Sequence, residues 1–190
     1  MIKKMLQTKK ELTLEEFFAL PADDVTYELV NGEAILKMSP KKFHSRLTRV
    51  LLQLLSEWCD ERGEVCPELG IKLTRTNRDW VPIPDLLYIS VERFPADWDQ
   101  DGVCSVPPEL VIEIISPGQT FGDLMTKARD YLNAGVLRVW IVDSQARSIT
   151  VFYPDAPAQT YRSDTPLIDS LFEGLEITAE QVFQLAKIPQ

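Results

Sequence analysis

The segment that most constrains the fold is residues 109–115, Glu-Leu-Val-Ile-Glu-Ile-Ile, which is aliphatic almost throughout but holds one carboxylate inside. An apolar run without polar alternation predicts a strand covered on both faces of a sheet. Because side chains alternate along a strand, Glu113 shares a face with Val111 and Ile115. An unpaired charge buried there would cost several kcal/mol. We therefore expect Glu113 to be protonated, paired or bound to a metal.

A second carboxylate, Asp85, opens the apolar strand predicted at residues 84–90. Pro84 removes one donor of the strand ladder, so a strand begins here and Asp85 lies at an end or edge of the sheet, where a ligand can reach it. Each acid has an alternative structural role, such as capping a turn or pairing with Arg129 or Arg138. Position alone leaves a metal site and a structural acid equally open.

Other local patterns place helices and strands around these two segments. Thr13 begins a capping box, Asn31-Gly32 between two apolar runs predicts a hairpin, and an apolar stripe predicts a long helix that Gly63 ends. We expect, in order, a helix at 13–20, strands at 26–30 and 33–38, a helix at 41–62, strands within 64–73 and at 84–90, a loop at 92–108, a strand at 109–115, a helix at 122–134, strands at 137–143 and 148–153, and a helix at 178–187.

This order predicts an α/β fold of mixed type, with a central mixed β-sheet flanked by helices and preceded by an N-terminal helix and hairpin. The strand–helix–strand unit from 109 to 143 predicts a right-handed crossover between parallel strands. A length of 190 residues fits one domain. We expect residues 1–11 to form a flexible tail and residues 12–190 a single domain. Tyr131 and Trp140 are expected in its core.

Composition argues against several classes of protein. No apolar run approaches the roughly 20 residues of a membrane helix, and the basic residues 1–10 lack the apolar segment of a secretory signal. Three cysteines without a C-x-x-C spacing disfavour a disulfide framework or a zinc site and favour a reducing cytoplasm. No G-x-S-x-G motif supports a covalent hydrolase. The net charge of −9 argues against tight nucleic-acid binding unless a metal and a local basic patch supply attraction.

Short motifs across the chain resemble one known family when they are taken together. They are Tyr27-Glu28-Leu29-Val30-Asn31-Gly32-Glu33, Met38-Ser39-Pro40 followed by His44, Pro84-Asp85, Glu113-Ile114-Ile115-Ser116-Pro117, and the series Asp123, Lys127, Tyr131, Gly135-Val136 and Trp140-Ile141-Val142-Asp143. In this order they resemble the Uma-two family of restriction-endonuclease-like proteins, in the PD-(D/E)XK nuclease superfamily, over residues 12–183. The resemblance implies a restriction-endonuclease-like fold with the site at the open edge of the sheet.

The resemblance also implies an activity, that of a Mg²⁺- or Mn²⁺-dependent endonuclease acting on nucleic acid, with DNA as the expected substrate. Asp85 and Glu113 would hold the metal, helped by the main-chain carbonyl of Ile114. The metal would polarise the scissile phosphate and lower the pKa of the attacking water.

One position departs from the superfamily pattern, which has a lysine two residues after the glutamate where this chain has Ile115. Lys127 on the next helix is the candidate replacement, which would orient the nucleophile or stabilise negative charge on the phosphate. The alternative is a lysine whose ammonium lies in water or pairs with Asp123.

Further residues have both a site role and a structural alternative. Glu28 would be a third acid near the metal, or a cross-strand partner of Lys37. His44, the only histidine, would touch the substrate phosphate, or be a structural residue, since one histidine cannot make a zinc site. Arg46 would bind substrate as part of a basic cluster, or face solvent; the cluster comprises Lys41, Lys42, Arg46 and Arg49.

Ile115 and the acidic charge also leave open a catalytically inactive nuclease-fold module for binding or assembly. An exposed β-edge and the proline-rich loop at residues 94–108 favour a homodimer, which would let such an enzyme cut both strands of a duplex.

Overall fold

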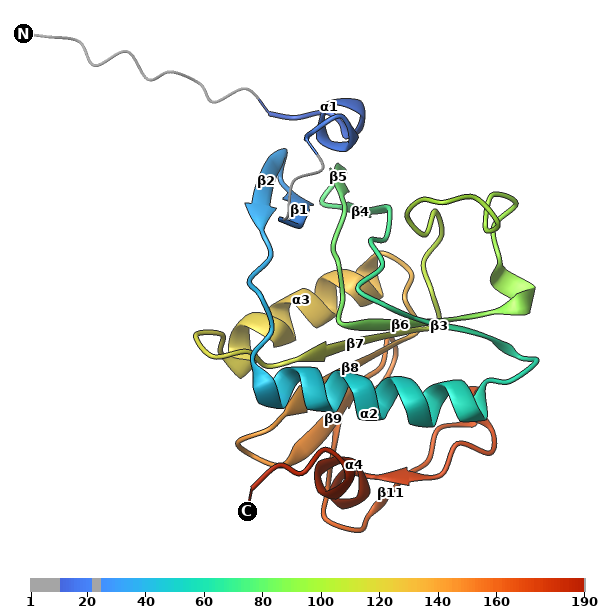
Figure 1. Cartoon of the computed structure of the whole chain (residues 1–190). Coiled ribbons are helices and arrows are strands. Elements are labelled where there is room, and N and C mark those ends of the chain that lie inside the picture. The colour runs from blue at the N-terminus through green and yellow to red at the C-terminus, as the bar shows by residue number, and fades with distance from the viewer. Residues whose placement is uncertain (1–10, 22–24, 190) are drawn as a thin grey trace, which may run out of the picture.

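The computed structural model describes residues 11–21 and 25–189 (Figure 1). We predict a flexible tail at residues 1–11, and residues 1–10 of it lie outside the described residues. The helices are α1 Leu14–Phe18, α2 Lys42–Trp58, α3 Phe121–Asn133 and α4 Ala179–Leu185, with short 3-10 helices η1 Val91–Arg93 and η2 Ser170–Phe172. The strands are β1 Tyr27–Val30, β2 Glu33–Leu36, β3 Gly63–Pro67, β4 Leu73–Arg75, β5 Arg78–Trp80, β6 Leu86–Ser90, β7 Leu110–Ile114, β8 Arg138–Asp143, β9 Ser148–Phe152, β10 Gln159–Arg162, β11 Pro166–Leu167 and β12 Ile177–Thr178.

Six strands form the central sheet in the order β10-β9-β8-β7-β6-β3. Within this sheet β7 and β8 are parallel, with Glu113 opposite Ile141, and the other neighbouring strands are antiparallel. The parallel pair is joined through α3, so the predicted strand–helix–strand unit and the mixed sheet are confirmed. No helix among the described residues is long and apolar enough to cross a membrane.

Helices cover both faces of the sheet (Figure 1). On one face α2 and α4 pack over Leu110, Ile112 and Ile114 of β7. On the other face α3 packs over Val111, the side on which Glu113 also lies, and the fully buried Tyr131 belongs to this second core. Covered faces explain why the central strands are apolar throughout. The alternation predicted along β7 is therefore confirmed.

The β1–β2 hairpin docks on the main body through one strand-like contact. Asn31 and Gly32 turn the chain with positive φ angles of 53° and 78°, the left-handed geometry that an Asn-Gly turn provides. The amide nitrogen of Leu29 donates to the carbonyl of Val81 at 3.1 Å, and Val81 donates back at 3.0 Å. Leu29 is fully buried. The hairpin is thus fixed against the residues that lead into Asp85.

The long helix is shorter than the one predicted over residues 41–62. α2 ends at Trp58, and Gly63 instead begins β3, opposite Ser90 of β6. A Cβ atom at residue 63 would lie 2.2 Å from the Ile89 carbonyl oxygen. The prediction that Gly63 ends the helix is wrong, because this glycine is required by the close approach of β3 to β6.

Candidate active site

Asp85 lies where the chain enters β6, against the middle of β7. Its amide nitrogen donates to the Ile112 carbonyl at 3.1 Å, and its Oδ2 atom accepts from the Ile114 amide nitrogen at 2.7 Å. The side chain is only 5% exposed. Because the backbone of β7 holds this carboxylate in one direction, Asp85 is positioned by the same strand that carries Glu113.

Two basic side chains face the Asp85 carboxylate. His44 of α2 places Nε2 2.9 Å from Oδ2, and Lys37, just after β2, places Nζ 3.5 Å from Oδ1. Burial acts to raise the pKa of Asp85, but the hydrogen bond and charge of His44, the charge of Lys37 and the Ile114 amide outweigh it and lower the pKa. Asp85 is therefore a carboxylate at neutral pH.

Glu113 is held from the helix side of the sheet. Its Oε1 atom accepts a hydrogen bond from the Tyr131 hydroxyl at 2.8 Å and lies 2.9 Å from Lys127 Nζ. The pKa of Glu113 is raised, chiefly by burial. The charge of Lys127 acts to lower it, and the charges of Asp85 and Glu28 add to the rise. Burial also raises the pKa of Tyr131, so its hydroxyl keeps the proton it donates.

Lys127 lies between two acids. Its Nζ atom is 3.0 Å from Glu28 Oε1, in addition to the 2.9 Å contact with Glu113. Burial disfavours the ammonium, but the two carboxylates prevail and raise the pKa of Lys127, so it stays charged. Asp123 instead accepts from the Thr120 amide nitrogen at 3.0 Å, in the capping box of α3. The alternative in which Lys127 pairs with Asp123 is wrong, because this cap engages Asp123.

Glu28 and Lys37 both enter the site but do not pair with each other as the structural alternative proposed. Glu28 accepts from the Ile83 amide nitrogen at 2.8 Å, whereas Lys37 donates to the Ile83 carbonyl at 3.0 Å and faces Asp85. The residue opposite Glu28 in the hairpin register is Ile35. Lys37 is a site residue that sequence reasoning missed. Its one signal was that it shares a strand face with Ile35, and therefore with Glu28.

These groups line one cavity of about 410 Å³ at the ends of β6 and β7. Two lysines and four carboxylates line the cavity, which gives it a formal charge of −2 when the histidine is neutral. The charged residues are Lys37, Lys127, Glu28, Glu68, Asp85 and Glu113. Ile114 and His44 also line it. A polar cavity with several carboxylates and a fixed ammonium has the groups needed for acid–base or metal-assisted chemistry.

The structure does not bring Arg46 to this cavity. Its Nη1 atom donates to the Lys187 carbonyl at 3.2 Å, beyond α4. Arg138, one of the arginines considered as partners for the acids, pairs instead with Asp169 through Nε at 2.5 Å and Nη2 at 3.1 Å. The cations that meet the two acids are therefore lysines and a histidine.

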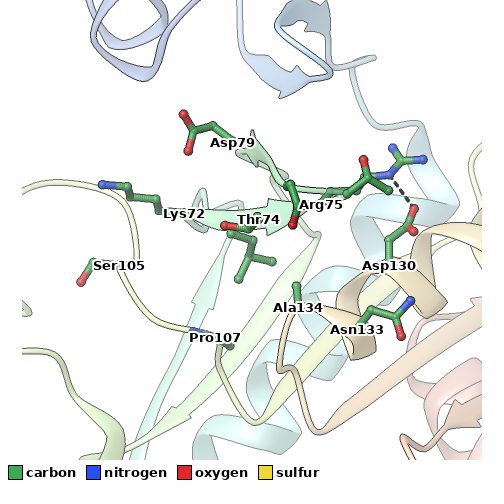
Figure 2. Close-up of a pocket in the computed structure, with 12 residues that line it drawn as sticks. Lys72, Thr74, Arg75, Asp79, Ser105, Pro107, Asp130, Asn133 and Ala134 are labelled. Carbon is green, nitrogen blue, oxygen red and sulfur yellow. Dashed lines mark ion pairs between the residues drawn. The ribbon is translucent and has the colours of Figure 1, made fainter.

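A larger cavity of about 610 Å³ lies elsewhere, between the β4–β5 hairpin and the end of α3 (Figure 2). Arg75 and Asp130 meet there at 2.9 Å, and Lys72 and Asp79 also line it. The smaller cavity is taken as the candidate site because Asp85 and Glu113, the carboxylates set into the buried strand segments, line it.

The donor set fits a hard divalent cation that keeps much of its own water. Among the described residues, no three histidine, cysteine or acidic side chains surround one point. The hydrogen bond from Tyr131 and the contact with Lys127 both fall on Glu113 Oε1, and no hydrogen bond from the described residues reaches Oε2. Two carboxylates completed by water and phosphate oxygens are a typical environment for Mg²⁺.

The thiols offer no activated nucleophile. Cys59, Cys66 and Cys104 are free, and burial, reinforced by Glu64, raises the pKa of Cys66 to about 12. Burial also raises the pKa values of Cys59 and Cys104. Because the thiolate is the reactive form, covalent catalysis by cysteine gains no support.

The fold and the family match identify the class as a restriction-endonuclease-like protein. A sequence model of the Uma2 family, described as "putative restriction endonuclease", matches residues 14–180. The chain belongs to this family, and membership supports a nuclease role. A crystal structure titled a putative nuclease of DUF820 from Anabaena variabilis has the same fold, with a TM-score of 0.80 and 21% identity over 92% of this chain and 99% of that one. No curated protein matches the chain.

Proposed function

We propose that this protein is a divalent-metal-dependent endonuclease that hydrolyses phosphodiester bonds of DNA. The observation that carries the proposal is that Asp85, Glu113 and Lys127 line one cavity, with the ammonium of Lys127 2.9 Å from the Glu113 carboxylate. Two carboxylates that can hold a metal ion and a fixed cation can together stabilise the charge that develops when a phosphodiester is hydrolysed. The family and the fold support the nuclease class.

Asp85, Glu113 and the main-chain carbonyl of Ile114 would hold Mg²⁺ or Mn²⁺. When bound, the metal would polarise the scissile phosphate and lower the pKa of the attacking water. The formal charge of −2 in the cavity supports this assignment, because it attracts a divalent cation and repels a phosphate that arrives without one.

The chain's own residues would orient and stabilise the reacting groups. Lys127, which stays charged, would donate a hydrogen bond to the attacking water or to a phosphate oxygen and so stabilise developing negative charge. Glu28 holds Lys127 from the hairpin side, and Tyr131 holds Glu113 from α3. His44, which fixes Asp85, would also face the substrate phosphate.

A cleavage assay tests the proposal with single- and double-stranded DNA and RNA, each with Mg²⁺, with Mn²⁺ and with a chelator. We expect metal-dependent cleavage of DNA that Asp85→Ala abolishes. Because Asp85 also holds the β7 backbone, Asp85→Asn is tested beside it and both variants are checked for folding by circular dichroism. Asp79→Ala, which removes an exposed acid from the larger cavity, is the matched control and should leave cleavage unchanged (Figure 2).

Two results would contradict the proposal. Folded wild-type protein that cleaves none of these substrates with either metal would favour the alternative of an inactive nuclease-fold module. Cleavage that survives in folded Asp85→Asn protein would remove Asp85 from the chemistry. The homodimer stays a prediction, which light scattering of the purified chain would test.

A further inference from the structure

A third cavity, which we call the flanking cavity, adjoins the candidate active site. It measures about 440 Å³ and lies between the start of α2, the residues after β7 and the residues that follow α4. His44 and Pro117 line both this cavity and the one that holds the acids. The shared residues place the flanking cavity directly beside the cavity in which a phosphate would reach Asp85.

The charge of the flanking cavity is opposite to that of the chain. Lys41 and Lys42 line it, and none of the described residues in its lining is acidic. The whole chain carries a net charge of −9, and the adjoining cavity a formal charge of −2. Neither lysine forms an ion pair with an acid in the part of the chain that the structure describes. Their ammonium groups are therefore available to an anion such as a phosphate.

An aromatic ring lies beside these lysines. Phe43, in the first turn of α2, lines the flanking cavity with 41% of its surface exposed, although most large apolar residues of the chain are buried. Ile115 and Ile188 add aliphatic surface to the same lining. A flat apolar ring in the same cavity as unpaired cations is a combination that binds single-stranded nucleic acid, since a base stacks on the ring while a phosphate meets the lysines.

We propose that the flanking cavity binds an unpaired nucleotide of the substrate, next to the phosphate that is cut, with its base against Phe43 and its phosphate at Lys41 and Lys42. This rests on the proposed nuclease function and adds a substrate class to it. A base inside a duplex is already stacked on its neighbours and cannot reach the ring, so the preferred substrate is single-stranded or locally unpaired. Pockets of roughly 300–1,000 Å³ hold small organic ligands, so the cavity is large enough for one nucleotide.

Binding, measured apart from cleavage, tests the inference. The full chain is titrated against a fluorescent oligothymidylate of about 12 nucleotides and a duplex of the same length, by anisotropy at low salt with metal chelated. We expect the wild type to prefer the single strand. Phe43→Ala should weaken single-strand binding roughly tenfold and leave duplex binding unchanged. The double variant Lys41→Ala, Lys42→Ala should lower the slope of log affinity against log salt by about 0.7, because both lysines meet the one phosphate of the bound nucleotide.

Two matched controls separate this cavity from the general surface. Phe18→Ala removes an exposed ring of α1, and Lys72→Ala removes a lysine of the larger cavity; neither should change binding (Figure 2). A Phe43→Ala protein that binds the single strand as the wild type does, while the wild type still cleaves nucleic acid with metal, would overturn this inference alone. A wild type that neither binds nor cleaves any nucleic acid would overturn the proposed function as well.

Discussion

The ammonium of Lys127 and the carboxylate of Glu113 meet at 2.9 Å across one face of the sheet. Lys127 lies on α3 and Glu113 on β7, so the contact depends on how α3 packs against this face of the sheet. A buried carboxylate that has gained such a partner depends on it.

Replacing Lys127 tests that dependence. Lys127→Met keeps the length of the side chain but leaves Glu28 and Glu113 facing each other without a cation. We expect a loss of about 3 kcal/mol in the free energy of unfolding at neutral pH, measured by urea titration, and loss of cleavage. Adding Glu113→Gln should restore most of the stability without restoring activity. If Lys127→Met alone is as stable and as active as the wild type, Lys127 does not have this role.

Tyr131 is expected to position Glu113 through its hydroxyl. Tyr131→Phe removes one hydrogen bond to a buried charged group and keeps the ring, so unfolding should become easier by about 1.5–3 kcal/mol, and the cleavage rate should fall. The control is Tyr161→Phe, whose hydroxyl bonds Gln159 at the surface, and which should lie within about 0.5 kcal/mol of the wild type. Equal effects of the two changes would argue against a positioning role.

Lys37 should oppose metal binding at Asp85, because its Nζ atom lies 3.5 Å from Oδ1 and carries the same sign of charge as the metal. We expect Lys37→Met to bind Mn²⁺ several-fold more tightly in isothermal titration calorimetry. Lys72→Met, in the larger cavity, serves as the control and should bind as the wild type does. Weaker binding by Lys37→Met would contradict the expectation.

The cap of α3 gives a defined pH dependence of stability. Hydrogen bonds from the Thr120 hydroxyl and amide lower the pKa of Asp123 below its ordinary value of 3.8. A lowered pKa stabilises the folded chain above about pH 4, and the contribution is lost as the pH falls through the lowered pKa. Asp123→Asn should therefore be less stable than the wild type at pH 7, and the difference should shrink in strong acid. Thermal unfolding across pH measures both, and a pH-independent difference would rule out this cause.

Gly63 should tolerate no side chain. A Cβ atom there would lie 2.2 Å from the Ile89 carbonyl oxygen, a backbone atom that cannot rotate away. We expect Gly63→Ala to lower the free energy of unfolding by roughly 1–3 kcal/mol through overpacking. Gly102→Ala is the matched control, since a Cβ at Gly102 would meet nothing within 4 Å. Denaturant titration measures the free energy of unfolding of both variants. Equal stability of Gly63→Ala and Gly102→Ala would contradict the steric argument.

Local sequence pattern is enough to predict which face of the sheet each side chain of a strand takes. Alternation in residues 109–115 placed Glu113 on the face opposite Ile112 and Ile114, and the structure confirms it. The core position of Tyr131 was also predicted and is confirmed, but its hydroxyl bond was not, because periodicity describes which way a side chain faces and not which atom it meets.

Contacts between distant segments were beyond the sequence. The hairpin pattern offers Lys37 as a partner of Glu28, but Lys37 faces Asp85, which is 48 residues further along the chain. That choice depends on how the hairpin docks at Val81, which no local pattern reports. Local pattern also predicts Gly63 as a helix end, whereas a glycine is needed there because of the close approach of β6, which lies later in the chain.

The docking of Leu29 on Val81 has a consequence for how the site comes into being during synthesis. The hairpin with Glu28 and Lys37 leaves the ribosome long before Val81, and a lone two-stranded hairpin is at best marginally stable in water. Glu113 and Lys127 follow later still. A partly made chain therefore carries some of the site's residues without the site, and the complete lining of the cavity cannot form before Lys127 of α3 has been translated.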